Sequence, residues 1–527
     1  MPSNPLFASF RTVSVLTMLS RILGFIRDVI FAQILGAGLA TDAFLVAFKL
    51  PNLFRRLTAE GALTQAFLPA YSLVRQQTGP DKALILAVEV QAIVLASLCA
   101  LILVIELLMG PVISLMAPGF DPESDLFDAS VLLANVTMPY LAMISLVALW
   151  SALCQAENDF ASGAFAPVLL NLCLIGGALI IPYTSRAAGW SEAYWGLPLA
   201  CAVILAGILQ MVFLQLRLRR NGCRPAFSWP GFSVQGSKMW SSFIPAALGA
   251  GGMQLNLLVD VILASGLGVG AISWLYYADR LAQLPLGVVG IAMGTALLPR
   301  LSALQAEART DRQAQSGFAQ TLADGFAPVL ILVLPATAAL ISLSEVLISG
   351  LFGSDAFDAA DIAASSSALM AYASGLPAFV GSKLTQPAFY AMNRGRVVMM
   401  LSLAGVGLNI IGSLILMHPF GHTGLAMATS AAGWAVFLSH LVMLARSGRL
   451  DSRSASVLFR VLTATAVMAG GIYICQYLMA GYELGATSQM VVLVIAGIMI
   501  YTAAAFLLKL APYLLKGAQP VQPEESS

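Results

Sequence analysis

Long apolar stretches separated by short polar ones dominate this chain. Crossing about 30 Å of hydrocarbon takes roughly 20 helical residues, and about fourteen stretches reach that length. We therefore expect an all-α polytopic membrane protein with about fourteen transmembrane helices. Their approximate ranges are 10–35, 40–73, 82–112, 124–155, 159–182, 191–220, 234–266, 269–304, 312–350, 359–392, 395–417, 422–446, 453–480 and 486–513.

Basic residues follow one side of this predicted topology. Because Lys and Arg accumulate in cytoplasmic loops, their positions indicate orientation. With the N-terminus inside, the outer loops contain almost no basic residue except Arg186, and the loop after the third segment is acidic. This alternation favours fourteen segments with both termini in the cytoplasm. The inner loops contain Arg75, Lys82, Arg217, Arg219, Arg220, Arg224, Lys238, Arg309, Arg312, Arg394, Arg396, Arg446, Arg449 and Arg453.

Composition excludes a soluble globule. Hydrophobic residues make up 59% of the chain and charged residues 10%, whereas ordinary domains carry about 25% charged residues. The net charge is only +1 and the basic residues are dispersed, so we expect no nucleic-acid partner. The six cysteines lack a C-x-x-C spacing and the three histidines are scattered. Buried apolar thiols explain the cysteines better than disulfides, and we expect no metal, cofactor or catalytic site.

Two segments of the chain repeat. Residues 28–38 recur as residues 260–270, and residues 68–72 are echoed by residues 298–302. Six segments separate the copies, so a parallel repeat with its substrate site between two lobes is indicated; chance similarity of apolar helices is the alternative. The predicted domains are an N-lobe (1–225), a C-lobe (226–447) and a C-terminal helix pair with a short tail (448–527).

Arginines lie inside the predicted membrane segments. A charged side chain near the bilayer centre costs at least about 2.5 kcal/mol, so each must face a protein-lined or watery interior. On the first helix Arg21, Gly24 and Asp28 share one face, which Arg27 widens. Lipid cannot cover such a polar sector, so we expect it to line a cavity.

The second segment carries a longer polar stripe. Pro51 interrupts the helical hydrogen bonds and can rotate the register, so periodicity leaves open whether Arg55 or Arg56 faces the interior. Heptad-like spacing, taken without any effect of Pro51, places one stripe of polar residues on this helix: Asp42, Lys49, Asn52, Arg56 and Glu60.

Arg280 is the counterpart in the second half, preceded by Tyr276, Tyr277 and Asp279. Guanidinium groups bind phosphate oxygens bidentately, so the whole set of arginines favours an anionic ligand with several oxygens. Internal salt bridges are the alternative for any one residue, such as Asp28 with an arginine or Arg56 with Glu60.

Asp260 lies toward the outer end of the seventh segment. It either binds a cation such as Na⁺ or a proton, or it pairs with Arg280 on the neighbouring helix.

Five motifs make the chain resemble a known family. They are Ser20 to Asp28 (SRILGFIRD), Thr41 to Phe44 (TDAF), Lys49 to Arg56 (KLPNLFRR), Ala59 to Ala62 (AEGA) and Tyr276 to Leu281 (YYADRL). Together they look like the signature of the MurJ (MviN) lipid II flippases, and the resemblance extends over nearly the whole chain.

This resemblance implies the multidrug/oligosaccharidyl-lipid/polysaccharide (MOP) exporter superfamily, with two six-helix lobes in a V and two further helices. It implies a transporter rather than an enzyme, one that moves lipid II from the inner to the outer leaflet of the bacterial cytoplasmic membrane by alternating access, for peptidoglycan synthesis and cell shape. In the family the last two helices form a groove for the undecaprenyl tail. The central cavity takes the pyrophosphate-linked disaccharide-pentapeptide. Membrane lipids and proteins of cell-wall synthesis and division are the other implied partners.

The resemblance also assigns roles to residues. It implies substrate binding by Arg21, Arg27, Arg55 and Arg280, and thus selects Arg55 over Arg56. Transport is expected to be driven by the membrane potential or a cation gradient. Relatives that bind sodium combine a carboxylate on helix 7 with polar and acidic groups on helices 11 and 12. Asp260 fits the first part, whereas helix 11 here offers Asn409 and Ser413 and no carboxylate. The expected gating and polar support groups are Asp42, Glu60, Asp28, Asp279, Arg56 and Lys49.

Other functions fit the sequence less well. A related O-antigen-type lipid-oligosaccharide flippase is the nearest alternative. A multidrug exporter should carry fewer arginines and more acidic residues, because its substrates are usually cations. A membrane glycosyltransferase needs a metal and sugar-nucleotide site on a long loop, and no loop here is long enough. A scaffold without transport leaves the charged membrane interior unexplained.

Overall fold

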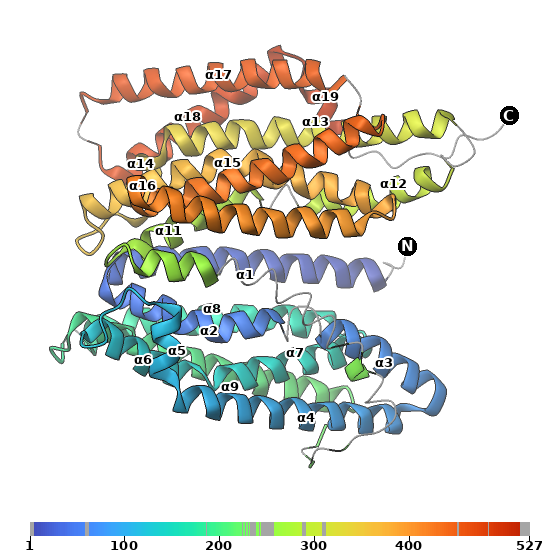
Figure 1. The fold of residues 1–527 in the computed structure, drawn as a ribbon, viewed down its shortest axis with the longest axis vertical. Helices are drawn as coiled ribbons and strands as arrows, with labels where there is room; N and C mark the ends of the chain where they lie inside the picture. Colours follow the sequence, from blue (N-terminus) through green and yellow to red (C-terminus); the bar gives the residue numbers. More distant parts are fainter. Residues whose placement is uncertain are drawn as a thin grey trace. The chain divides into compact units, whose positions relative to one another are not determined.

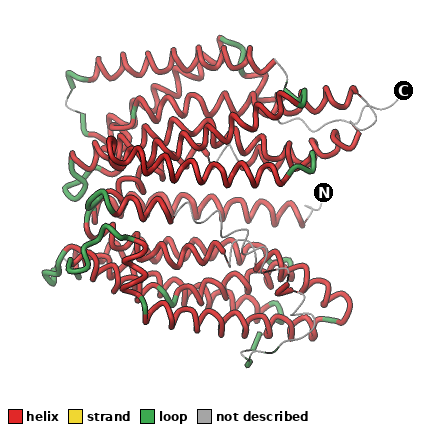
Figure 2. Tube along the Cα trace, in the orientation of Figure 1, coloured by secondary structure: helices red, strands yellow, loops and turns green. Residues whose placement is uncertain are grey.

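The computed structural model contains only helices as regular secondary structure among the residues it describes (Figure 2). This confirms the predicted all-α class. The described residues are 5–57, 63–185, 187–223, 225–226, 228–229, 231, 239–241, 243, 258–286, 291–307, 312–450, 453–482 and 484–516.

The chain divides into two compact units. Unit 1 comprises Met1–Ser273 and Ser354–Phe357, and unit 2 comprises Trp274–Gly353 and Asp358–Ser527. The boundary therefore falls inside helix α11 (Ala271–Pro285). The predicted lobes and C-terminal helix pair stay a prediction.

Helices form because the apolar segments must satisfy their backbone groups internally. The helices of unit 1 (Figure 1) are α1 (Pro5–Leu35), α2 (Leu39–Leu57), α3 (Leu63–Thr78), α4 (Pro80–Leu107), α5 (Met109–Met116), α6 (Asp125–Thr137), α7 (Tyr140–Ala156), α8 (Phe160–Ile180) and α9 (Leu197–Arg220). After α11, unit 2 contains α12 (Ile291–Glu307), α13 (Arg312–Ser342), α14 (Ser344–Phe352), α15 (Ala359–Ala391), α16 (Gly395–Arg446), α17 (Arg453–Met479), α18 (Ala486–Leu507) and α19 (Ala511–Lys516).

Within the described residues, eight helical stretches are long and apolar enough to cross a membrane. The protein is therefore a multi-pass membrane protein, while the number fourteen stays a prediction. The eight stretches are Pro80–Leu107, Asp125–Ala156, Phe160–Tyr183, Glu192–Arg220, Gly317–Ser342, Gly395–Arg446, Ser456–Met479 and Ala486–Leu507.

Helix α16 is two helices that meet at a kink. Gly421 has φ 55° and ψ −135° inside its 52 residues. Only glycine adopts such angles without strain. The kink lies between the predicted segments 395–417 and 422–446, so these two ranges are separate helices.

Aromatic packing holds the start of unit 1 together. Phe31 on α1 meets Phe44 on α2 edge to face, with ring centroids 5.9 Å apart, and Phe44 stacks on Phe48 at 5.5 Å. Gly36, in the turn between these helices, packs directly against another segment of unit 1, since a Cβ on it would lie 1.9 Å from the carbonyl oxygen of Ala356. This packing fixes the polar faces of α1 and α2.

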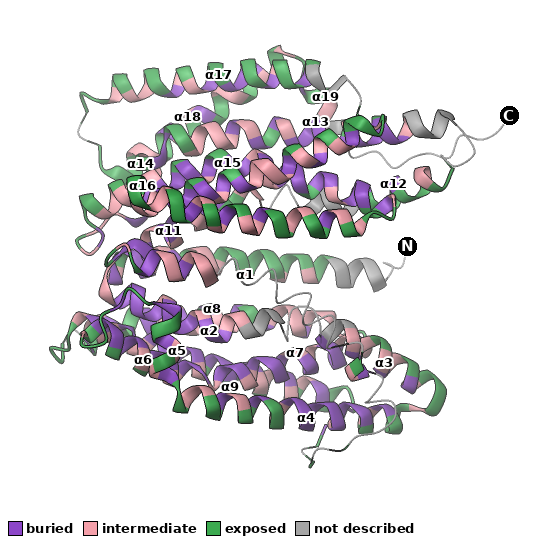
Figure 3. Cartoon of the chain, viewed as in Figure 1, coloured by how far each residue is buried: buried purple, intermediate pink, exposed green. Residues whose placement is uncertain are grey.

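Unit 2 has a buried apolar core and an outer layer of helices. Buried apolar residues of α12, α13, α15 and α16 form the core, and α17 and α18 pack on each other and on α13. The outer face of α17 stays exposed (Figure 3), with Tyr473 at 70% and Tyr477 at 76%. Aromatic residues near a helix end are typical of the membrane interface.

The cysteine prediction was correct only in part. All six thiols are free, and Cys154 and Cys223 are buried. Cys99 and Cys201 are exposed on α4 and α9, because an apolar helix that faces lipid has no need to bury a small apolar side chain.

An ion pair with a hydrogen-bonded serine joins α8 and α9 at one end of unit 1. The Asp159 carboxylate accepts hydrogen bonds from the Ser162 hydroxyl at 2.7 Å and from Nη2 of Arg217 at 3.0 Å, which ties α8 to α9. Burial raises the pKa of Asp159, but the bonds from Ser162 and Arg217 outweigh burial and hold the pKa below its usual value.

We expect Asp159→Asn to lower the apparent melting temperature of the purified protein by about 1–3 °C at neutral pH. Because folding lowers the pKa of Asp159, its stabilisation is present above the usual pKa of 3.8 and is lost as pH falls below that value. The difference between wild type and variant should therefore shrink as the pH is lowered below 3.8. The matched control is Asp81→Asn, since Asp81 is exposed and its side chain makes no hydrogen bond to another described residue. A difference independent of pH would contradict this account.

Candidate functional site

Arg27 is held in place by three hydrogen bonds to two polar neighbours within unit 1. Its Nε and Nη2 donate to Oδ1 of Asp28 at 3.0 and 2.7 Å, and its Nη1 donates to Oδ1 of Asn171 at 2.9 Å. The Asp28 side chain is 3% exposed and that of Arg27 is 13% exposed. The guanidinium also lies over the Phe31 ring, 5.7 Å from its centroid. The internal salt bridge that the sequence left open is therefore present for this residue.

Asn171 on α8 is a site residue that the sequence reasoning missed. Its Nδ2 donates to the backbone carbonyl of Ser20 at 2.9 Å, so one amide connects two positions of α1. Asn171 is 6% exposed. It is a lone amide inside an apolar helix, and a polar residue in such a setting was the sequence signal that indicated a functional or structural contact. Gly24 lies beside this amide, and a Cβ there would be in ordinary van der Waals contact with Nδ2 at 3.6 Å.

Arg21 differs from Arg27. It lies on an exposed part of α1 and makes no hydrogen bond or ion pair with other described residues. Its neighbours Met18 (55% exposed) and Ile22 (51%) are apolar. This part of α1 therefore presents one cation among apolar side chains.

Asp42 on α2 is fully buried and caps a helix start. It accepts hydrogen bonds from the backbone N–H groups of Gly270 at 2.6 Å and Ser273 at 3.0 Å, and a third from the Ser273 hydroxyl. The first turn of a helix has N–H groups without helical partners and a partial positive charge, which a carboxylate stabilises. Asp42 therefore fixes the first turn of α11 within unit 1.

The rest of the α2 stripe is described only in part. Lys49 is half-buried, and α2 continues through Pro51 to Leu57, so the proline does not end the helix. The side chains of Arg55 and Arg56 lie outside the described residues, as does the whole of Glu60. The choice between the two arginines stays a prediction.

Arg280 lies on α11 in unit 2 and is half-buried. Its Cζ lies 4.6 Å from the centroid of the Tyr276 ring, one helical turn earlier. A cation over a tyrosine face is stabilised by the ring quadrupole. Asp279 beside it accepts a hydrogen bond from Gln283. Tyr276 thus helps to orient Arg280.

The candidate cation site has few assembled ligands. Asp260 is half-buried in unit 1. In unit 2, Oδ1 of Asn409 accepts a hydrogen bond from Thr429 at 3.1 Å, and Ser413 is fully buried. Among the residues described, no group of three His, Cys, Asp or Glu side chains could hold a metal ion. The role of Asp260 stays a prediction.

We expect Asn171→Leu to reduce transport about tenfold, because Arg27 loses a charge-assisted hydrogen bond and with it a fixed orientation. Leucine has a similar volume, so packing of α1 on α8 should persist. Initial transport rates and melting temperatures of the purified variant would be compared with those of Asn171→Gln, which keeps the amide and should recover part of the rate. Full activity of the leucine variant would show that Asn171 does not position Arg27.

Comparisons with known proteins agree on one family. The model of the lipid II flippase MurJ family matches residues 31–495. A probable lipid II flippase MurJ of Rhizobium tropici is 35% identical over 519 residues, covering 95% of this chain and 94% of that protein. One of Vibrio cholerae is 34% identical and covers 89% of each chain.

Solved structures with similar folds identify the fold of this chain. A lipid II flippase MurJ in an inward closed conformation superposes with a TM-score of 0.77 at 22% identity, covering 94% of this chain and 98% of that one. An inward-facing multidrug resistance MATE family transporter of the MOP superfamily gives a TM-score of 0.63 at 15% identity, covering 85% and 98%. The chain therefore has the fold of this group of membrane transporters.

Proposed function

Since this chain belongs to the MurJ family of lipid II flippases, we propose that its membrane-embedded arginines bind the pyrophosphate of lipid II during translocation. The protein is a lipid II flippase and serves peptidoglycan synthesis. The observation that carries the proposal is the position of Arg27, a guanidinium that is 13% exposed and oriented by both Asp28 and Asn171.

The proposed binding step uses charge and geometry together. A guanidinium presents five N–H donors in a planar fork, which matches two phosphate oxygens. Asp28 compensates Arg27 in the absence of substrate, so the cation is tolerated in a low-dielectric interior. Arg21, Arg55 and Arg280 supply the further positive charge that a pyrophosphate requires. Asp28, Asp279, Lys49 and Arg56 act as polar support.

Translocation is proposed to proceed by alternating access, which requires gates. We assign Asp42 and Glu60 to the gates. The support for Asp42 is its cap on the first turn of α11, whose later residues belong to unit 2. When these hydrogen bonds break, the N–H groups of Gly270 and Ser273 lose their acceptor, which costs free energy. The state with an intact cap and a closed gate is therefore favoured until substrate binding offsets that cost.

The driving force is proposed to be electrical. An inside-negative potential acts on each cavity charge with about 2.3 kcal/mol per 100 mV, enough to return a net positive site to the inward state. A cation gradient acting through Asp260 is the other candidate. No covalent step is needed, so the protein acts as a transporter and not as an enzyme.

We place the protein in the bacterial cytoplasmic membrane with both termini inside. The basic inner loops support this orientation. Proteins of cell-wall synthesis and division are proposed partners, since the flipped precursor must be consumed at the outer face.

Substrate selectivity tests the proposal. Purified protein would be titrated with lipid II and with other polyprenyl-linked sugars that share the undecaprenyl tail. We expect lipid II to bind at least about tenfold more tightly, since its headgroup makes additional hydrogen bonds. Equal affinity for an O-antigen-type lipid would favour the related lipid-oligosaccharide flippase instead.

A further inference from the structure

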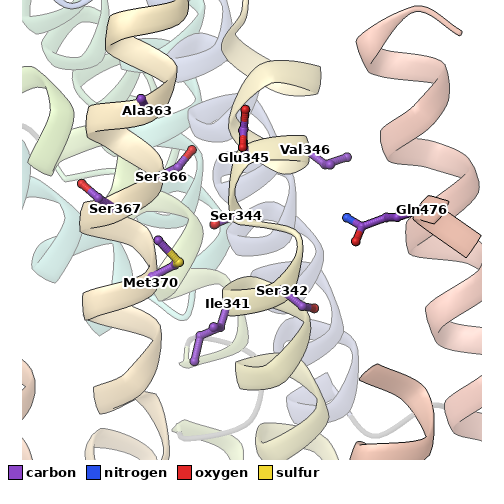
Figure 4. A pocket seen from close by; sticks show the side chains of 10 residues that line it. All are labelled: Ile341, Ser342, Ser344, Glu345, Val346, Ala363, Ser366, Ser367, Met370 and Gln476. Atoms are coloured by element: carbon purple, nitrogen blue, oxygen red, sulfur yellow. The ribbon is translucent and has the colours of Figure 1, made fainter. Parts of the chain in front are cut away.

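Unit 2 contains a cavity whose lining includes no arginine. Its volume is about 480 Å³, and it lies among the end of α13, α14, the start of α15 and the later part of α17 (Figure 4). Small-molecule sites typically measure about 300–1,000 Å³. Polar groups that line the cavity include Ser344, Glu345, Ser366 and Gln476.

Ser366 points to a ligand. It is 5% exposed, and its hydroxyl has no hydrogen-bond partner among the described residues. Figure 4 shows its side chain extending from α15 toward Glu345 on α14. The adjacent Ser367 turns the other way and bonds Thr423 at 2.8 Å. Buried hydroxyls in native proteins are nearly always satisfied, so a ligand group in the cavity would complete Ser366.

The lining fixes the charge of that ligand. Glu345 is its one ionisable side chain, and the other polar groups are hydroxyls and an amide. With no basic residue in the lining, a phosphate or carboxylate would meet the carboxylate of Glu345 without compensation. A primary ammonium has three N–H donors and fits a carboxylate surrounded by oxygen acceptors.

Position in the membrane selects a lipid over a soluble amine. α13 ends and α15 begins at the cavity, whereas the basic residues Arg312, Arg394 and Arg453 lie at the opposite ends of α13, α15 and α17. By the positive-inside rule the cavity therefore lies at the outer interface, at the level of lipid headgroups. Ile341 (37% exposed) and Met370 (41%) add apolar surface to the same lining.

We propose that this cavity binds the ammonium headgroup of an outer-leaflet phospholipid. Glu345 pairs with the ammonium, while Ser366 and Gln476 accept its remaining hydrogen bonds. The apolar side chains of the lining contact the start of the acyl chains.

Lipid retention by the purified full-length protein tests this site. The protein in detergent would receive equal amounts of phosphatidylethanolamine and its N-acetyl derivative with the same acyl chains, and intact-mass measurement would count the lipid retained. We expect wild type to prefer the free ammonium about tenfold, because the N-acetyl group removes a charge-assisted pair. Glu345→Gln should reduce the preference to about twofold or less, and Ser366→Ala to about threefold.

Glu123→Gln is the matched control, because Glu123 is exposed on the acidic loop after α5 and lies outside the cavity lining. It should keep the wild-type preference. Equal retention of both lipids by wild type would overturn the proposal, as would a tenfold preference kept by either cavity variant. Displacement of phosphatidylethanolamine by equimolar lipid II would instead assign the cavity to the substrate and contradict a phospholipid site.

Discussion

Arg27→Ala is expected to lose lipid II translocation by at least about 100-fold, because a bidentate, charge-assisted contact to phosphate disappears. The variant also removes the guanidinium that pairs with the Asp28 carboxylate, whose side chain is 3% exposed. Removing one member of a buried pair costs roughly 3–5 kcal/mol, so a loss of folding could produce the same phenotype.

A double variant separates the two effects. Arg27→Ala with Asp28→Asn removes both charges of the pair and should recover melting temperature relative to Arg27→Ala. Transport should stay lost. Arg27→Lys keeps the charge without the fork and should retain a small fraction of the rate. The measurements are accessibility of lipid II at the outer face of cells and the amount of folded protein in their membranes. Restored transport in the double variant would show that Arg27 serves only to neutralise Asp28.

Asp42→Ala is expected to have the second largest effect. It leaves the N–H groups of Gly270 and Ser273 without their acceptor, and each orphaned buried donor costs about 1–3 kcal/mol. The first turn of α11 should therefore open more often, and transport should fall about 30-fold or more. Ser273→Ala removes one of the three hydrogen bonds and should be milder.

Opening of this turn can be measured directly. A cysteine would replace Val269, which is 49% exposed, in a chain whose six natural cysteines are replaced by serine. Asp42→Ala should raise its rate of reaction with a membrane-impermeant maleimide about tenfold. An unchanged rate, together with unchanged transport, would remove Asp42 from the gate.

Apolar patterning was sufficient to predict the helical class and the multi-pass character. Each segment must bury its backbone polar groups, and that requirement leaves a strong periodic signal in the sequence. The same signal separated the two halves of α16, where Gly421 supplies the kink. The count of fourteen stays a prediction, because the described part of the chain contains eight stretches that qualify as spans, one of which holds both halves of α16.

The candidate site was predictable in residue type but not in pairing. Periodicity placed Arg27 and Asp28 near each other without deciding whether they bond, because adjacent side chains on a helix diverge unless rotamers bring them together. Asn171 is 144 positions from Arg27 along the chain, and nothing in an apolar helix states which neighbour its amide will meet. Asp42 bonds mainly to backbone N–H groups, which carry no sequence signature.

Transport in proteoliposomes tests the central claim most directly. Purified wild type, Arg27→Ala and Arg280→Ala would be reconstituted at equal density with labelled lipid II on one leaflet, and its transfer to the other leaflet would be followed with and without an inside-negative potential. We expect transfer by wild type that the potential accelerates, and loss of at least about 100-fold in both variants. Wild-type rates in both arginine variants would contradict it.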